Sequence, residues 1–121
     1  MGLFDTTEIA LERALSGSSQ RQQLLANNLA NADTPGFKRS DLDFHTALAN
    51  ALDSGDSSSQ LESLQFQPQT DTTGSMTEDG NNVDVDTEMS NLTQNSLDYE
   101  SLISVASARI KMLSTAIGSG Q

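Results

Sequence analysis

The chain of 121 residues contains no cysteine and only one histidine, His45. A disulfide framework and a thiolate metal site are therefore excluded. The common zinc sets need several Cys or His side chains. The sequence also has no glycine-rich phosphate loop, and nothing near His45 positions a nucleophile. We therefore predict no metal, no cofactor and no catalytic site.

Acids near residue 80 suggest calcium, but their spacing is wrong. An EF-hand loop that begins at Asn82 needs Gly at position 87 and Glu at position 93. Threonine occupies both positions. Turns and helix starts account for these acids.

Basic residues are scarce. The net charge is −11, and between Arg39 and Arg109 there are thirteen acids but no Lys or Arg. Nucleic acid binding requires clustered cations, so nucleic acid is excluded as a partner. No apolar run is long enough to cross a bilayer, so we expect no membrane insertion. Asp5, Glu8 and Glu12 precede the first Arg, which is the wrong charge for a cleaved secretory signal.

Apolar residues are also few, at 35% of the chain, with 4% aromatics. A globular domain has more, so we do not expect an ordinary self-contained core. We predict a mainly α protein with three regions. These are an N-terminal core helix (1–33), a turn with a short helix and a loop-rich outer segment (34–82), and a C-terminal core helix (83–121).

The first helix is predicted over residues 5–33, with Asp5 as its cap and Glu8 completing a capping box. Apolar and small residues recur at steps of three and four from Phe4 to Ala32. Gly17 interrupts this helix, which indicates either a bend or the close approach of a neighbouring backbone.

The first helix must end before Pro35, because Thr34 is pushed out of the α region. Pro35 and Gly36 form a turn pair that redirects the chain outward. Asn28 and Asn31 lie in the last helical turns, where carbonyl groups lack partners. Their amides either cap this helix or reach a neighbouring subunit.

The middle region begins with a short helix that we place after Ser40 as its cap. Residues 53–82 have few large apolar side chains and a run of Ser, Gly and Asp. Such a segment does not hold itself together. We expect a loose excursion with a short strand at residues 64–66.

Order returns at Val83, where acids suit the start of a helix, and Gly118 marks its expected end. Apolar residues then recur at steps of three and four over four heptads, which is typical of a coiled-coil seam. The seam includes Leu92, Tyr99, Ile103, Ile110 and Leu113. We assign it to pairing with the N-terminal helix of the same chain, as a coiled-coil-like hairpin.

A second apolar row on this helix contains Leu97, Val105 and Met112, with the small Ser101 and Ala108 between them. It lies about 180° from the seam. A two-helix hairpin covers only one of the two faces. Either the middle region folds over the second row, or the row packs against adjacent subunits, and a helix apolar on two sides favours the second reading.

Two segments resemble the flagellar rod and hook axial proteins. Residues 21–38, RQQLLANNLANADTPGFK, resemble the N-terminal motif of this family, and residues 41–44, DLDF, continue it. Residues 79–89, DGNNVDVDTEM, resemble the start of the C-terminal helix in its proximal-rod members. Asn81 and Asn82 lie in this second motif.

This resemblance implies a structural subunit of the proximal rod of the bacterial flagellar basal body. Such subunits pass through the flagellar type III export channel and assemble helically through their terminal helices. The rod spans the periplasm, transmits torque and encloses an export channel. The implied partners are copies of the chain, other rod proteins, the adaptor FliE, the MS ring and the export gate. The alternatives are another short rod protein and a non-polymerising helical adaptor.

Overall fold

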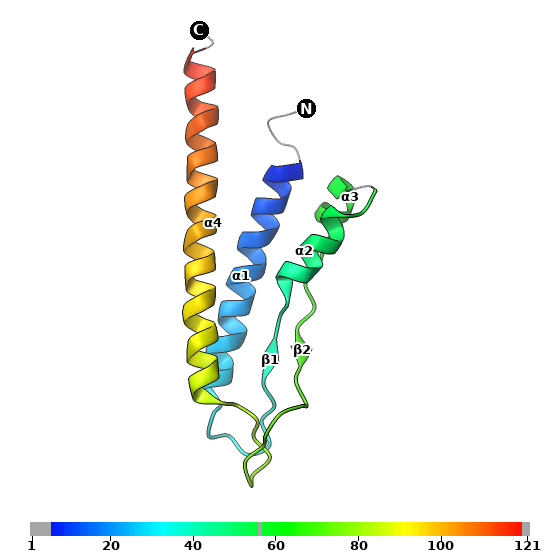
Figure 1. Ribbon diagram of the computed structural model, residues 1–121, viewed down its shortest axis with the longest axis vertical. Coiled ribbons are helices and arrows are strands. Elements are labelled where there is room, and N and C mark those ends of the chain that lie inside the picture. The colour runs from blue at the N-terminus through cyan, green and yellow to red at the C-terminus, as the bar shows by residue number, and fades with distance from the viewer. Residues whose placement is uncertain (1–5, 56, 120–121) are drawn as a thin grey trace.

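The computed structural model describes residues 6–55 and 57–119, and within them the fold is mainly α-helical (Figure 1). The first and last elements are the two long helices, α1 (Thr6–Ala30) and α4 (Val85–Ser119). Between them come β1 (Ser40–Asp41), α2 (Phe44–Leu52), α3 (Ser57–Ser63) and β2 (Gln69–Thr70).

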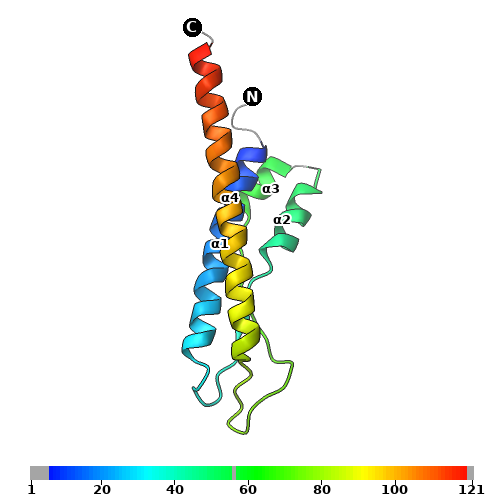
Figure 2. The same cartoon turned by 60° about the vertical axis from the view of Figure 1, so that its left-hand side comes forward.

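Helices α1 and α4 lie side by side and run in opposite directions, as expected for a hairpin (Figures 1 and 2). Asn28 near the end of α1 meets Glu88 near the start of α4, and Glu8 near the start of α1 meets Arg109. Helix α4 is ten residues longer, since α1 has 25 residues and α4 has 35. Its C-terminal turns therefore extend beyond Thr6, the first described residue of α1.

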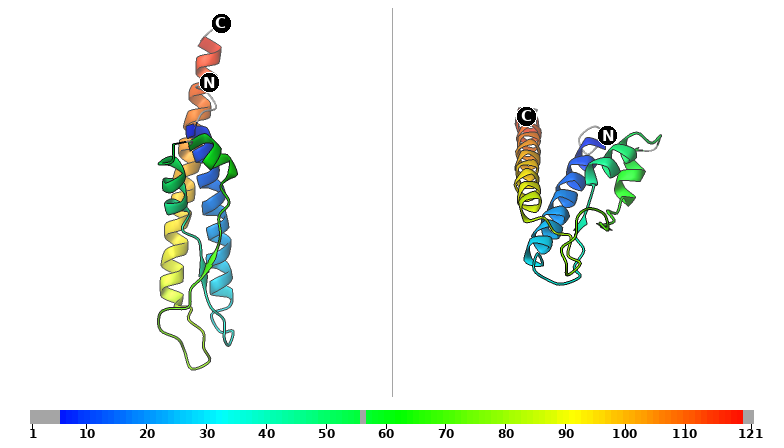
Figure 3. Two further views of the ribbon diagram at one scale, coloured as in Figure 1. Left: turned by 90° about the vertical axis from the view of Figure 1, so that its right-hand side faces the viewer. Right: turned by 60° about the horizontal axis from the view of Figure 1, so that its bottom comes forward.

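The apolar core does not lie between the two long helices. It lies on the other side of α1, where α2 and α3 pack (Figure 1; Figure 3, right). Its buried members are Ala14, Leu42, Phe44, Leu48, Ala51, Leu61 and Phe66. The middle region therefore covers α1, and the alternative in which it folds over the second row of α4 is wrong.

Gly17 is explained by a close approach. A Cβ atom built on Gly17 would lie 2.7 Å from Cβ of Phe44, which is nearer than two such carbons can come. Phe44 is 1% exposed and packs edge-on against Phe66, with ring centroids 6.4 Å apart. The expected neighbour is thus a side chain from α2, and not a backbone.

The middle region is more ordered than the sequence predicts. The predicted loose segment contains α3, whose Leu61 is fully buried, and β2, which pairs antiparallel with β1. The register places Ser40 opposite Thr70 and Asp41 opposite Gln69. Residues 64–66 are not a strand; Phe66 is instead buried beside Phe44. Two large apolar side chains are enough to anchor this segment.

Several predicted boundaries shift. Helix α1 ends at Ala30, so residues 31–33 belong to the turn, and the expected cap Asp5 lies outside the described residues. Helix α2 is capped by Asp43, whose carboxylate accepts a hydrogen bond from the backbone N–H of Thr46 (3.1 Å). The expected cap, Ser40, is part of β1. Gly118 does not end α4, which continues to Ser119.

Candidate functional site: a polar clamp and the exposed faces of helix α4

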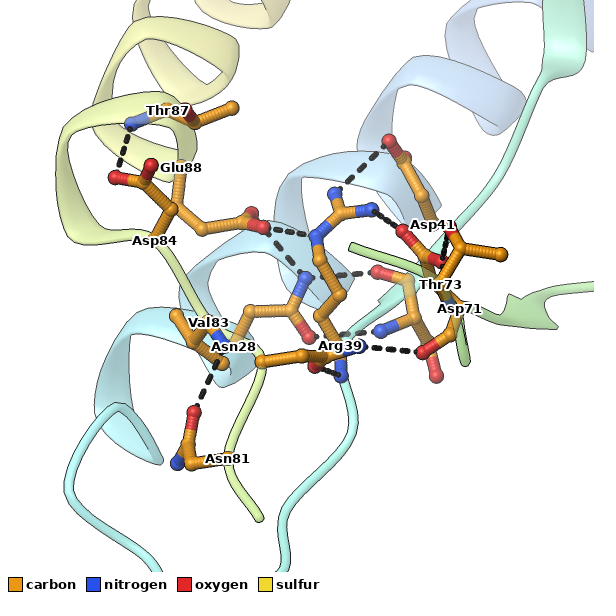
Figure 4. A network of polar contacts seen from close by, with 12 residues as sticks. Asn28, Arg39, Asp41, Asp71, Thr73, Asn81, Val83, Asp84, Thr87 and Glu88 are labelled. Carbon is orange, nitrogen blue, oxygen red and sulfur yellow. Dashed lines mark hydrogen bonds and ion pairs between the residues drawn. The ribbon is translucent and has the colours of Figure 1, made fainter. Parts of the chain in front are cut away.

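The closed end of the hairpin is the end where α1 finishes and α4 begins. It is held by a set of polar groups, four of them buried and Arg39 partly buried, that we call the polar clamp: Asn28, Arg39, Asn81, Asn82 and Glu88. Figure 4 labels all of them but Asn82. Asn28 is 1% exposed and sits in the last turns of α1. Its amide nitrogen donates to the carbonyl of Ser40 (2.7 Å) and to Glu88 (3.2 Å). Its amide oxygen accepts the Ser40 N–H (3.0 Å). One side chain thus ties α1 to β1 and to α4.

Arg39 is the electrostatic centre of the polar clamp. Its guanidinium donates from Nε to the buried carboxylate of Glu88, from Nη1 to Asp71 (3.2 Å) and from Nη2 to Asp41 (3.3 Å) (Figure 4). Burial works against the charged form, but the hydrogen bond to Glu88 and the attraction of the carboxylates together raise the pKa of Arg39. A buried charge is tolerated only with such partners.

Asp41 links this centre to α1. Its carboxylate accepts from Nε of Arg21 (2.8 Å) as well as from Arg39. Burial alone would raise the pKa of Asp41, but the hydrogen bonds from Arg21 and from the Leu42 N–H outweigh it, so the pKa is lowered. The pKa of Asp71 is also lowered, first by the hydroxyl of Thr73. Both carboxylates are therefore held in the ionised state that the two arginines need.

Asn81 and Asn82 fasten the two loops of the closed end to each other. The Asn81 amide donates to the carbonyls of Asn31 (2.9 Å) and Thr34 (2.8 Å). The Asn82 amide donates to the carbonyl of Asp71 (2.6 Å), and its oxygen accepts the Arg39 N–H (2.7 Å). The orphan carbonyls after α1 thus find their partners fifty residues further along the chain.

Gly36 and Asn31 have the turn and capping roles that the sequence predicts, whereas Asn28 does not. Gly36 has a φ of +74°, which an L-residue rarely adopts. Its N–H donates to the carbonyl of Asp79 (2.8 Å), so the Thr34–Pro35–Gly36 turn lies against the second loop. Asn31 bonds locally to the carbonyl of Asn27 (2.8 Å), as a helix cap does. The interpretation of Asn28 as a plain cap is wrong, because its amide bonds to β1 and α4.

The face of α4 that meets α1 is more polar than predicted. Glu88 and Asn95 are fully buried on it, seven residues apart, and Leu102 and Arg109 continue the same row. The Asn95 amide donates to the carbonyl of Ser18 (2.8 Å) and to Gln22 (2.8 Å). Arg109 donates to Glu8 (2.6 Å) at the open end. An ion pair at the open end, and amide hydrogen bonds in the middle and at the closed end, therefore join the two helices.

The predicted apolar seam is wrong at several of its positions. Leu92 and Leu113 are half-buried, as expected, and Tyr99 is 37% exposed. Ile103 and Ile110, however, are 42% and 64% exposed. The true contact row is displaced by one residue at these heptads, to Leu102 and Arg109. A search for apolar periodicity selects isoleucine, whereas the interface uses Glu, Asn and Arg.

The second predicted row remains uncovered in this structure. Leu97, Val105 and Met112 are 55%, 52% and 70% exposed, and Ala108 and Ser101 between them are exposed too. Helix α4 therefore carries two exposed apolar faces. We call the row of Leu97, Ser101, Val105, Ala108 and Met112 the far row, and the row of Met89, Ser96, Ile103, Ile110 and Ile117 the flank row.

Other kinds of site find no support in the described part of the chain. No group of three or more metal-ligating side chains is found there. None of the helices described is long and apolar enough to span a bilayer. His45 stacks on Phe44 (ring centroids 4.2 Å apart) and contacts Asp98 of α4 (3.4 Å), which is a structural contact between α2 and α4.

These features define a class: an elongated helical-hairpin protein with a polar closed end and an uncovered C-terminal helix. Residues 10–38 match the family of flagella basal body rod proteins. Over its full length the chain is 34% identical to the flagellar basal body rod protein FlgB of Bacillus subtilis, of which the alignment also covers 100%. It is 33% identical to FlgB of Escherichia coli, over 98% of this chain and 99% of that protein.

A third relative is matched over nearly its whole length. The chain is 31% identical to FlgB of Borrelia hermsii, over 97% of this chain and 99% of that protein. The chain therefore belongs to the FlgB family of flagellar basal body rod proteins.

Proposed function

We propose that this protein is a structural subunit of the proximal rod of the flagellar basal body, and that it assembles helically through its terminal helices. Membership of the FlgB family supports the rod as its location. The observation that carries the assembly is the pair of exposed apolar rows on α4, since large apolar side chains on two sides of one helix favour burial between partners.

The polar clamp supports the proposal of a rigid subunit that can transmit force. It joins α1, both loops and the start of α4 through hydrogen bonds of defined direction, so the closed end resists bending of one helix against the other. A rod that transmits torque needs such stiffness between neighbouring contacts. Most of the α4 surface then remains available for partners, because α2 and α3 pack mainly on α1 and meet α4 only near Asp98 and Leu102.

The partners proposed are other copies of the chain and other rod proteins, with FliE, the MS ring and the export gate at the base. We propose export through the flagellar type III apparatus without cleavage of a signal peptide. No catalytic role is proposed. A non-polymerising adaptor remains the rival, and it predicts a finite oligomer at every concentration.

The test is to delete the gene in the bacterium that produces this protein, and to restore it as the wild-type or a variant gene. Removal should abolish motility and yield no complete rods, and the wild-type chain should be recovered by mass spectrometry in isolated basal bodies. Val105→Asp should remain folded and exported but be absent from basal bodies, because a carboxylate buried without a partner costs several kcal/mol. Gln67→Asp, at an exposed position away from α4, is the matched control. Normal rods in cells that lack the chain would refute the proposal.

A further inference from the structure

A groove runs between α1 and α4 on the side away from α2. Two hollows mark it, of about 300 Å³ and about 390 Å³. Helix α1 lines them with residues at steps of three and four, so both hollows lie along one side of that helix: Glu8, Glu12, Leu15, Ser19 and Gln22. Ser96, Tyr99 and Glu100 form the opposite wall of the first hollow, and Ala106 that of the second. The exposed Ile103 of the flank row follows Ser96 and Tyr99 at helical spacing, so it lies on the same side of α4.

The far row lies on nearly the opposite side of α4. Ser101 and Ile103 are two residues apart, as are Ala108 and Ile110, so the two rows point about 160° away from each other. The far row has small residues at Ser101 and Ala108, seven residues apart, and Thr115 extends this repeat by one step beyond the far row. The flank row has the same repeat at Met89, Ser96 and Ile103. Bulky residues of one row can therefore seat over small residues of the other along a shared length.

We propose that the groove of one subunit receives the far row of α4 from a second copy of this chain. The inference rests on the proposed function, and it adds the contacting surfaces and their register. Because the groove and the far row are different surfaces, the contact is heterologous and each copy can bind two others in an open series. Copies must share one orientation for this series to continue, so the two α4 helices run parallel.

Charge complementarity supports this occupant and selects the register. The groove edge carries Glu12 and Glu100, both exposed. The far-row side of α4 carries Lys111, one of only two Lys or Arg residues after Arg39, and the described residues offer it no hydrogen-bond or ion-pair partner. An offset of about twelve residues, or roughly 18 Å, places Lys111 of the second copy within one residue of the level of Glu100 in the groove of the first copy.

The same offset also places the large Met89 and Ile103 over small residues, with two small residues meeting between them. Met89 of the first copy lies over Ser101 of the second, Ser96 lies beside Ala108, and Ile103 lies over Thr115. The other two offsets that the seven-residue repeat allows, five and minus two, leave Lys111 about six residues or more from Glu100, roughly 9 Å or more along the axis. The register of twelve therefore satisfies packing and charge together.

The absence of cysteine makes a cross-linking test clean. Two differently tagged chains, Ile103→Cys and Thr115→Cys, are produced together in the producing bacterium, and basal bodies are isolated after mild oxidation. We expect the mixed disulfide dimer to exceed the dimer from either variant alone at least tenfold. Ile103→Cys with Ser101→Cys, which represents the offset of minus two, is the matched control and should give no mixed dimer. Circular dichroism of each variant checks that it folds.

A charge exchange provides a second readout. Lys111→Glu should lower incorporation into basal bodies several-fold, and adding Glu100→Lys in the same chain should restore it. Dimers formed equally well by one cysteine variant alone would indicate a symmetric contact and overturn the inference. So would basal bodies that contain both chains but no mixed dimer, an outcome that leaves the proposed function intact. A wild-type chain absent from basal bodies would instead refute the proposed function itself.

Discussion

Asn28 and Ser40 exchange two hydrogen bonds, with the side-chain amide of Asn28 facing both the N–H and the carbonyl of Ser40. The amide thereby takes the place of a neighbouring strand on the free edge of β1. The third contact, from the same amide nitrogen to Glu88, brings the start of α4 to this point. A single side chain therefore fixes three segments that are distant in sequence.

Asn28→Ala should destabilise the fold by about 2 kcal/mol or more, because two backbone groups of Ser40 and the buried Glu88 lose a partner. Urea unfolding followed by circular dichroism measures this free energy. Gln23→Ala, at an exposed position of the same helix, should change it by less than about 0.5 kcal/mol. Equal effects of the two substitutions would contradict the role given to Asn28.

Gly17→Ala should destabilise the protein by about 1–3 kcal/mol, although alanine is the better helix former. The added Cβ would lie 2.7 Å from Cβ of the buried Phe44, so α2 must shift away from α1. Gly118→Ala is the internal comparison: it lies in α4 with open space around it and should be neutral or mildly stabilising. The melting temperatures of both variants test the difference, and a stabilised Gly17→Ala would show that α2 does not pack there.

Acid should weaken the polar clamp. The pKa of Asp41 is lowered in the folded protein, so its carboxylate stabilises the fold above the ordinary Asp pKa of about 3.9. That stabilisation is lost as pH falls through the lower, folded-state pKa. The free energy of unfolding should be nearly constant from pH 7 to about pH 5 and decline below about pH 4. Asp41→Asn should reduce the decline, while Asp33→Asn, in the exposed turn, should preserve it.

Asn95→Leu should stabilise the isolated hairpin by about 1 kcal/mol. Asn95 is fully buried against α1, and its amide oxygen has no hydrogen-bond partner among the described residues. Burying such a group without a partner is unfavourable, while a polar residue at a helix contact favours one register. Denaturant unfolding measures the stability. Cysteines introduced at position 18 and at position 99, one turn after residue 95, report by disulfide formation whether an alternative register is populated. A loss of stability would mean that the two hydrogen bonds of the Asn95 amide outweigh the cost of its unpaired oxygen.

Neighbouring residues of α4 should respond differently to charge. Leu102→Asp should disrupt the subunit, because Leu102 packs against the core cluster. Ile103→Asp should leave the helical content of the purified chain unchanged, because Ile103 is 42% exposed. Far-ultraviolet circular dichroism compares the two. Incorporation into basal bodies should fail for both, and normal incorporation of Ile103→Asp would show that the flank row is free in the rod.

The long helices and the turn between them could be predicted because their signals are local. Apolar periodicity, the Thr34–Pro35–Gly36 turn and the acids at the start of α4 act within a few residues of one another. The contacts of Asn81 with Asn31 and Thr34 could not be predicted from the sequence, because the side-chain amides of loop residues follow no periodic pattern. Arg39 was missed as the centre of the clamp for the same reason.

The helix interface shows a second limit. Glu88, Asn95 and Arg109 share a seven-residue spacing with Leu102, so a signal existed in the sequence. The periodicity of apolar residues does not include these polar positions. It predicts instead that Ile103 and Ile110 face α1, whereas both are exposed. The exposed isoleucines are the residues that we propose to meet another subunit.

The contacts between α1 and α4 have a consequence for the order in which the chain folds. Asn28 meets Glu88 across 60 residues, and Glu8 meets Arg109 across 101. Closing such loops is slow, and it requires the whole intervening chain to be present. A chain released from a narrow passage with its N-terminus first could therefore form α1 and the small core early. The hairpin closes only after residue 88 has emerged, so both long helices pair late in the folding of the chain.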